Sequence, residues 1–138
     1  GKMQNRKDLA QGMAAHDIPY VGQTTLLGNM RDIYEKSEKA IYTPGAAFLN
    51  VMAPCPRGWR YPTEQIMDIC KLAVETCYWP LFEVIEGKVI VHRVLHANSL
   101  NDFLFRTNIS PTAGEDEILS QSKHFWKLID EGKNASKA

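Results

Sequence analysis

Residues 44–59 read Pro-Gly-Ala-Ala-Phe-Leu-Asn-Val-Met-Ala-Pro-Cys-Pro-Arg-Gly-Trp, and this stretch decides the fold. Residues 46–52 are almost continuously apolar and do not alternate with polar residues. Such a run is typical of a strand that is buried on both faces of a parallel sheet. Pro54 and Pro56 then restrict the backbone on either side of Cys55, so this most buried strand is expected to end in a stiff loop.

The residues before this stretch predict the start of a βαβ unit. Residues 18–22 form a short apolar run that predicts a strand, and Thr24 or Thr25 is expected to cap a helix that ends near residue 42. The apolar side chains of this helix recur at helical spacing, and its charged side chains are expected to form the solvated face. The apolar residues are Leu26, Met30, Ile33, Tyr34 and Ile41, and the charged ones are Arg31, Glu35, Lys36, Glu38 and Lys39.

The other predicted elements complete an α/β layout, which we interpret as half of an open parallel sheet. A helix that follows the stiff loop has an apolar stripe formed by Ile66, Ile69, Cys70, Ala73 and Val74. The predicted helices outside the βαβ unit cover residues 6–16, 62–77, 99–105 and 116–129, and the predicted hairpin joins residues 81–85 and 88–91 through Glu86 and Gly87.

Composition narrows the class of protein. The chain has 138 residues, with 16 Lys and Arg against 16 Asp and Glu, so the formal net charge is zero. A balanced charge gives no basic surface for nucleic acid or an anionic membrane, and no apolar run approaches the roughly 18 residues of a membrane span. The three cysteines are irregularly spaced, and the first residues lack a hydrophobic signal core. We therefore expect a cytoplasmic, single-domain protein without nucleic-acid or membrane partners.

Cys55 is the first candidate for chemistry because of its position. It comes three residues after the predicted buried strand, and ligands of open α/β sheets gather beyond the carboxyl ends of the strands. The following proline favours an extended backbone at Cys55, which would hold a thiolate in a preset direction, as a metal or iron–sulfur ligand requires. The alternative is a small thiol that is buried beneath a turn.

Other reactive residues lack a pattern that selects them. Cys70 and Cys77 lie seven residues apart on one predicted helix, too far for a disulfide, and are expected to be core residues. No histidine has the spacing of a metal site, and a nucleophilic pair of Cys55 with a histidine stays open without a preferred partner. Arg57 could bind an anion or pair with a nearby carboxylate. The histidines are His16, His92, His96 and His124, and the tryptophans, expected in the core or at an interface, are Trp59, Trp79 and Trp126.

Two segments together resemble a known family. Residues 44–59 and residues 72–84, Leu-Ala-Val-Glu-Thr-Cys-Tyr-Trp-Pro-Leu-Phe-Glu-Val, are similar to the C-terminal part of the beta subunit of 2-oxoacid:ferredoxin oxidoreductases, the family of pyruvate synthase. Residues 1–10 and 15–21 are similar to it as well. The resemblance implies the C-terminal half of a thiamine-diphosphate-binding-type open parallel sheet over residues 1–95. It leaves residues 96–138 as a C-terminal extension.

The resemblance also implies a chemistry and its cofactors. In the family, thiamine diphosphate and Mg²⁺ activate a 2-oxoacid such as pyruvate, electrons pass through [4Fe–4S] clusters to ferredoxin, and coenzyme A takes the acyl group; the reverse reaction fixes carbon dioxide. Cys55 corresponds to the last ligand of the cluster nearest thiamine. The other cluster cysteines and the Gly-Asp-Gly segment for diphosphate have no counterpart in this sequence. The chain alone is therefore expected to be an inactive part, and Cys77 to serve packing.

Implied partners are the remainder of the beta subunit, other oxidoreductase subunits and ferredoxin, with the 2-oxoacid and coenzyme A as substrates. Two alternatives from the residues themselves stay open. One is a small α/β thiol enzyme or binding module centred on Cys55. The other is a non-catalytic subunit-docking domain that uses its three tryptophans. Half of a parallel sheet would also expose an unpaired apolar edge, so we expect self-association.

Overall fold

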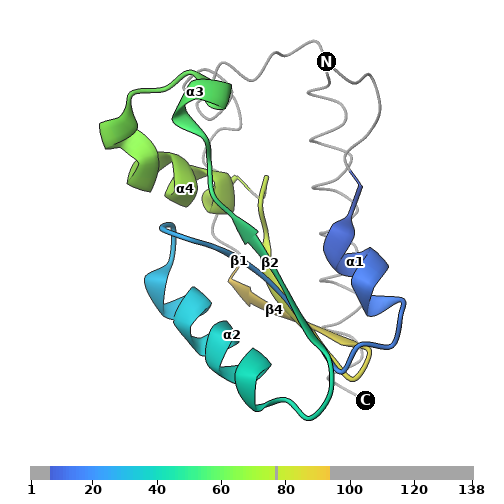
Figure 1. Cartoon of the computed structure of the whole chain (residues 1–138). Coiled ribbons are helices and arrows are strands. Elements are labelled where there is room, and N and C mark those ends of the chain that lie inside the picture. The colour runs from blue at the N-terminus through green and yellow to red at the C-terminus, as the bar shows by residue number, and fades with distance from the viewer. Residues whose placement is uncertain (1–6, 77, 94–138) are drawn as a thin grey trace.

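The computed structural model describes residues 7–76 and 78–93 (Figure 1). The helices predicted at residues 99–105 and 116–129 lie outside these ranges, as do Cys77, His96, His124, Trp126 and the side chain of His92. Within them, four strands form one sheet in the order β2-β1-β3-β4. No helix of the described part is both long enough and apolar enough to cross a bilayer.

The elements confirm an α/β fold that contains the predicted βαβ unit and hairpin. β1 pairs in parallel with β2, and α2 makes the crossover between them. β3 runs antiparallel to β1, and β4 runs antiparallel to β3. The elements are α1 (Leu9–Ala14), β1 (Tyr20–Thr25), α2 (Met30–Tyr42), β2 (Ala47–Met52), α3 (Pro56–Trp59), the 3-10 turn η1 (Thr63–Gln65), α4 (Ile66–Glu75), β3 (Leu81–Ile85) and β4 (Lys88–Arg93).

The prediction of an open parallel sheet with a separate hairpin is met only in part by the described residues, because the hairpin belongs to the sheet and makes it mixed. The hairpin joins the sheet through β3, which lies beside β1 and runs against it. β2 is an edge strand and not the most buried one, and Val51 on it is 40% exposed. β1 is buried along its whole length because it pairs with a strand on each side. Apolar content predicted a strand at β2 correctly, but it did not reveal the position of that strand in the sheet.

The start of α2 also differs from the prediction. Thr24 and Thr25 both belong to β1, and neither caps the helix. The cap is Asn29, whose side-chain oxygen accepts a hydrogen bond from the Asp32 N–H at 3.2 Å. The buried hydroxyl of Thr24 donates instead to the Asp32 carboxylate at 2.6 Å. Both threonines and Asn29 are residue types that favour helix caps, so pairing of β1 with its neighbours decided between them.

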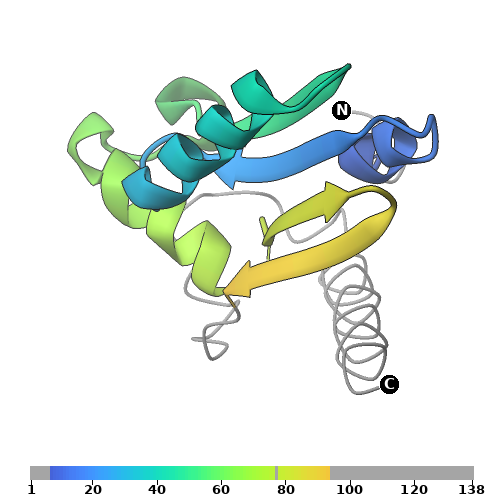
Figure 2. The ribbon, with the colours of Figure 1, turned by 90° about the horizontal axis from the view of Figure 1, so that it is seen from below.

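Two apolar clusters form the core, and α1 and α2 lie on opposite faces of the sheet (Figures 1 and 2). The first cluster joins α1 to the sheet face formed by Val21, Phe82 and Val84. The second cluster lies beyond the carboxyl end of β2, where α4 packs on Met52 and Tyr61. The apolar stripe predicted for this helix is confirmed: Ile66 is half-buried, and the other four members, Ile69, Cys70, Ala73 and Val74, are buried.

α2 reverses the expected arrangement of its side chains. The prediction that Lys36 lies on the solvated face is wrong, because Lys36 is 1% exposed and faces the sheet. The predicted apolar side instead faces solvent, with Met30, Tyr34 and Ile41 exposed by 59%, 71% and 77%. The reason is that the sheet face below α2 is polar, since it presents Tyr20, Thr24 and Glu83.

Candidate functional site

Cys55 lies at the carboxyl end of the parallel pair β1–β2, as the sequence predicts, and its side chain is exposed. Its backbone is extended, with φ −90° and ψ 115°, in agreement with the proline that follows it. The alternative of a thiol buried beneath a turn is therefore wrong. The carboxyl edge of the sheet presents this sulfur to solvent, where it can bind a partner atom.

The expected loop contains one short helix that orients Cys55. α3 begins at Pro56, whose fixed φ suits the first helical position. Cys55 is the N-cap residue: its Sγ accepts a hydrogen bond from the Gly58 N–H at 3.4 Å, and its carbonyl accepts one from the Trp59 N–H at 2.9 Å. The sulfur therefore has one amide donor of its own chain and a direction set by a helical turn.

Tyr61, which sequence reasoning missed, anchors the loop to the core. Its hydroxyl donates to the Pro54 carbonyl at 3.0 Å, and its N–H donates to the Pro56 carbonyl at 3.3 Å. Burial, followed by the charges of Cys70 and Cys55, raises the pKa of Tyr61, so the hydroxyl stays protonated and remains a donor. A proline-rich loop followed by a tyrosine is the signal that could have indicated this anchor.

The loop after β1 reaches the same edge. The Leu26 N–H donates to the Met52 carbonyl at 3.0 Å, which extends the parallel pairing past the end of β1. A Cβ on Gly28 would lie 2.9 Å from the backbone oxygen of Cys70, so only glycine fits there without movement. Cys70 itself is fully buried in α4, which confirms its predicted core role.

A buried charged cluster lies between α2 and the sheet, and the sequence analysis did not predict it. The Glu83 carboxylate of β3 is fully buried. It accepts hydrogen bonds from the Tyr20 hydroxyl at 2.5 Å and from Lys39 Nζ at 2.9 Å. Burial and the neighbouring carboxylate of Glu83 raise the pKa of Tyr20, so Tyr20 remains a hydrogen-bond donor well above neutral pH.

The second part of this cluster lies nearer the carboxyl end of β1. Lys36 Nζ donates to the Asp32 carboxylate and to the Gln23 carbonyl, both at 2.8 Å. Burial lowers the pKa of Lys36, although Asp32 and Glu83 act in the opposite direction. Every buried side-chain nitrogen and oxygen of the described chain has a hydrogen-bond partner. The cluster therefore fixes α2 to β1 and β3, and none of these hydrogen bonds involves Cys55.

The remaining candidates do not join Cys55. His16 follows α1 and precedes β1, so it lies at the amino end of the parallel pair, opposite to Cys55. This position excludes His16 as the base of a nucleophilic pair. Arg57 lies in α3 beside Cys55 and forms no ion pair with a described residue. Trp59 and Trp79 are half-buried against the second apolar cluster, and the Trp79 ring N–H donates to the Thr24 carbonyl at 2.7 Å.

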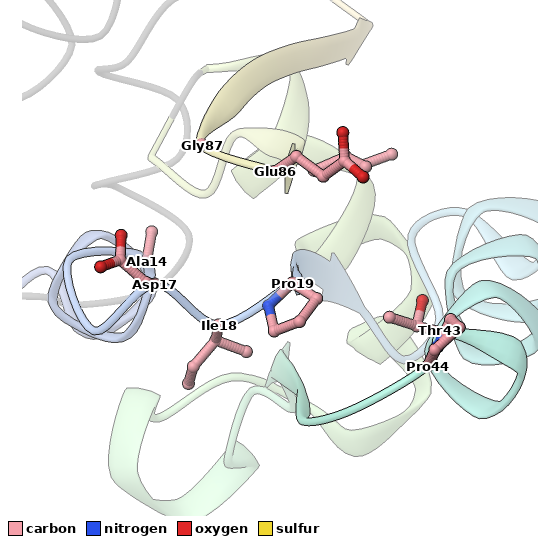
Figure 3. A pocket seen from close by; sticks show the side chains of 9 residues that line it. Ala14, Asp17, Ile18, Pro19, Thr43, Pro44, Glu86 and Gly87 are labelled. Atoms are coloured by element: carbon pink, nitrogen blue, oxygen red, sulfur yellow. The ribbon is translucent and has the colours of Figure 1, made fainter.

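A pocket opens at the amino end of β1, away from Cys55 (Figure 3). Three turns line it, with two carboxylates at its margin and no cysteine, histidine or serine. Its residues are Ala14, Asp17, Ile18, Pro19, Thr43, Pro44, Ile85, Glu86 and Gly87. Among the described residues no group of three metal-ligating side chains exists, so Cys55 can supply one ligand to a metal centre but cannot hold one alone.

Comparison with known proteins identifies relatives of this chain among oxidoreductase subunits. No protein-family model matches the chain. The chain is 36% identical over 124 residues to "Pyruvate synthase subunit PorB" of Methanosarcina barkeri, a match that covers 86% of this chain and 42% of that subunit. It is 41% identical over 133 residues to the PorB subunit of Methanocaldococcus jannaschii, covering 95% of this chain and 39% of that subunit.

A second group of relatives carries a different name. The chain is 41% identical over 85 residues to "Ketoisovalerate oxidoreductase subunit VorB" of Pyrococcus abyssi, covering 62% of this chain and 27% of that subunit. The chain thus spans less than half the length of these relatives. By sequence, this chain belongs with the beta subunits of 2-oxoacid:ferredoxin oxidoreductases and is homologous to the C-terminal part of PorB and VorB.

Proposed function

We propose that this chain is part of a 2-oxoacid:ferredoxin oxidoreductase and that Cys55 is one ligand of its [4Fe–4S] cluster nearest thiamine. The reaction is the coenzyme A-dependent oxidative decarboxylation of a 2-oxoacid, with pyruvate as the first substrate to test, or its reverse. The observation that carries the proposal is the exposed Cys55 thiol at the carboxyl edge of the parallel pair, in a chain related to PorB and VorB.

The surroundings of Cys55 fit an iron–sulfur ligand. Thiolates are the usual ligands of such clusters, and amide hydrogen bonds to the sulfur adjust the reduction potential. The Gly58 N–H supplies such a bond, and the α3 turn together with Tyr61 holds the sulfur in place. A [4Fe–4S] cluster needs four ligands, and the described residues offer one exposed thiol, since Cys70 is buried. The other three ligands are assigned to polypeptide other than the described residues.

Thiamine diphosphate fits this chain less directly. When bound, it supplies the carbon nucleophile that attacks the 2-oxoacid and the electron sink for the resulting carbanion. The described residues contain no glycine-rich diphosphate loop and no cation site, so its diphosphate and Mg²⁺ are assigned to the rest of the subunit. The contribution of residues 1–95 is then scaffold: the free edge of β2 is where the remaining strands of a thiamine-diphosphate-type sheet would add. Residues 96–138 remain a proposed extension.

Iron content tests the proposal in the assembled oxidoreductase. Cys55→Ala is expected to lower bound iron and acid-labile sulfide by up to about four atoms each per beta subunit, and to remove the corresponding cluster signal from the electron paramagnetic resonance spectrum. Cys70→Ala is the matched control, because it removes a buried thiol that reaches no ligand. Full iron content in Cys55→Ala would refute the cluster role. Rapid, stoichiometric alkylation of Cys55 in such an assembly would favour the thiol-enzyme alternative.

A further inference from the structure

α2 exposes a stripe of large apolar side chains that no described element covers. We name Met30, Tyr34, Ser37 and Ile41 the α2 stripe, and three of the four are large apolar residues that are more than half exposed. These positions follow the spacing four, three, four along the helix, so they share one narrow face. Exposed apolar patches of this kind mark interaction sites more often than ordinary surface.

The spacing of the α2 stripe is that of the a and d positions of a coiled coil. Tyr34 and Ile41 occupy a positions, and Met30 and Ser37 occupy d positions. The inward-facing Asp32, Lys36 and Lys39 lie away from this seam, because they bind the sheet and its neighbours. α2 therefore has two chemically different faces: a charged face toward the sheet and an apolar seam toward solvent.

We infer that the α2 stripe docks on the α2 stripe of a second copy of this chain, with the two helices antiparallel. A two-fold axis between residues 35 and 36 would place Met30 of each copy against Ile41 of the other. It would also place Tyr34 of each copy over the small Ser37 of the other. The stripe is thus self-complementary in size, which is what an isologous interface requires.

Charges beside the stripe favour the antiparallel orientation. Arg31 and Glu38 occupy the two e positions, and antiparallel helices bring e positions of the two copies together. Each Arg31 would then face Glu38 of the other copy. Arg31 now pairs with Glu35 at 2.6 Å, but its side chain is 87% exposed, and an exposed pair of this kind is worth little and can be exchanged. In a parallel pair the e positions would face Ile33 and Ala40, without any charge match.

This inference goes beyond the proposed function and depends on neither Cys55 nor a cluster. Sedimentation velocity of the 138-residue chain over a range of concentrations measures the dimer directly. Tyr34→Glu is expected to raise the dimer dissociation constant by about thirtyfold, because it places a charge at the centre of the interface. The control Met67→Glu changes an exposed apolar residue on α4, outside the α2 stripe, and is expected to leave the constant unchanged.

Charge exchange tests the orientation. Arg31→Glu and Glu38→Arg are each expected to weaken the homodimer by about tenfold, and an equimolar mixture of the two variants, or the double variant, is expected to restore wild-type affinity. Both positions are exposed, and circular dichroism verifies that each variant is folded. A monomer at all concentrations would refute the inference, as would a dimer that is insensitive to these exchanges. A dimer lost instead in Val51→Lys would place the contact at the edge strand β2.

Discussion

α2 and α4 are two helices of one small domain that treat apolar and charged residues in opposite ways. α4 buries Ile69, Cys70, Ala73 and Val74 and exposes Lys71. α2 buries Asp32 and Lys36 and exposes its apolar stripe. The difference originates in what lies beneath each helix, since α4 packs on the apolar Met52 and Tyr61. α2 lies over the sheet face that holds Tyr20, Thr24 and Glu83.

The comparison shows that amphipathic spacing defines which residues share a face and not which face is buried. A buried ion pair such as Asp32–Lys36 does not by itself make a protein more stable than an apolar pair would, because desolvation offsets the attraction. Its loss on one side is nevertheless costly, because one buried charge is left alone. The packing of α2 on the sheet therefore depends on specific charged partners, whereas the packing of α4 depends on apolar contacts.

The largest expected effect on stability comes from removing the buried cation of α2. Lys36→Met leaves the buried Asp32 carboxylate without its cation, and it is expected to lower the free energy of unfolding by about 3–5 kcal/mol. The matched control Lys71→Met removes an exposed lysine from the same kind of pair on α4 and should cost at most about 0.5 kcal/mol. Urea denaturation measures both. Equal costs for the two variants would contradict the burial of Lys36.

The double variant Asp32→Leu/Lys36→Met tests whether the two buried charges stabilise the fold as a pair. Removing both charges is expected to recover a large part of the loss, because no buried charge then remains unpaired within the pair. A double variant that is less stable than Lys36→Met alone would show that the two side chains act independently.

The second effect uses the same residue type on both helices. Ile69→Ala opens a cavity in the second apolar cluster and is expected to cost about 2–5 kcal/mol. Ile41→Ala removes a side chain that is 77% exposed, so its cost should stay within about 0.5 kcal/mol. Both are measured by denaturation at a concentration where the chain is monomeric. Similar costs would mean that Ile41 is buried within the monomer.

The smallest effect concerns pH. Because the pKa of Tyr20 is raised in the folded state, its contribution to stability is fully present below its ordinary pKa of 10.0 and is lost as pH rises above that value. Wild-type stability is therefore expected to fall above pH 10, and Tyr20→Phe should reduce this fall. Tyr61→Phe, near α4, should reduce it less, since no carboxylate binds the Tyr61 hydroxyl. Denaturation curves from pH 8 to about pH 11 measure the slopes.

Several elements could be predicted because their signals are local. The βαβ order, the Glu86-Gly87 hairpin and the apolar stripe of α4 depend on spacing and on turn residues, and all are present in the structure. The end-of-strand position of Cys55 followed from its place after an apolar run and between prolines, whereas its exposure, which the sequence left open, was decided by the structure. The Glu83 cluster could not be predicted in this way, because it joins residues that are distant in sequence and lie on different elements.

The amino-acid sequence by itself determined the α/β class, the resemblance to PorB and VorB, and the choice of Cys55 as the proposed ligand, because these depend on the order and type of residues along the chain. Only the tertiary structure decided the direction of β3, the edge position of β2 and which face of α2 is buried. Those features depend on pairing between distant segments. In α2, the free energy gained by giving the buried Glu83 and Lys36 hydrogen-bond partners outweighs the local preference of an apolar stripe for burial.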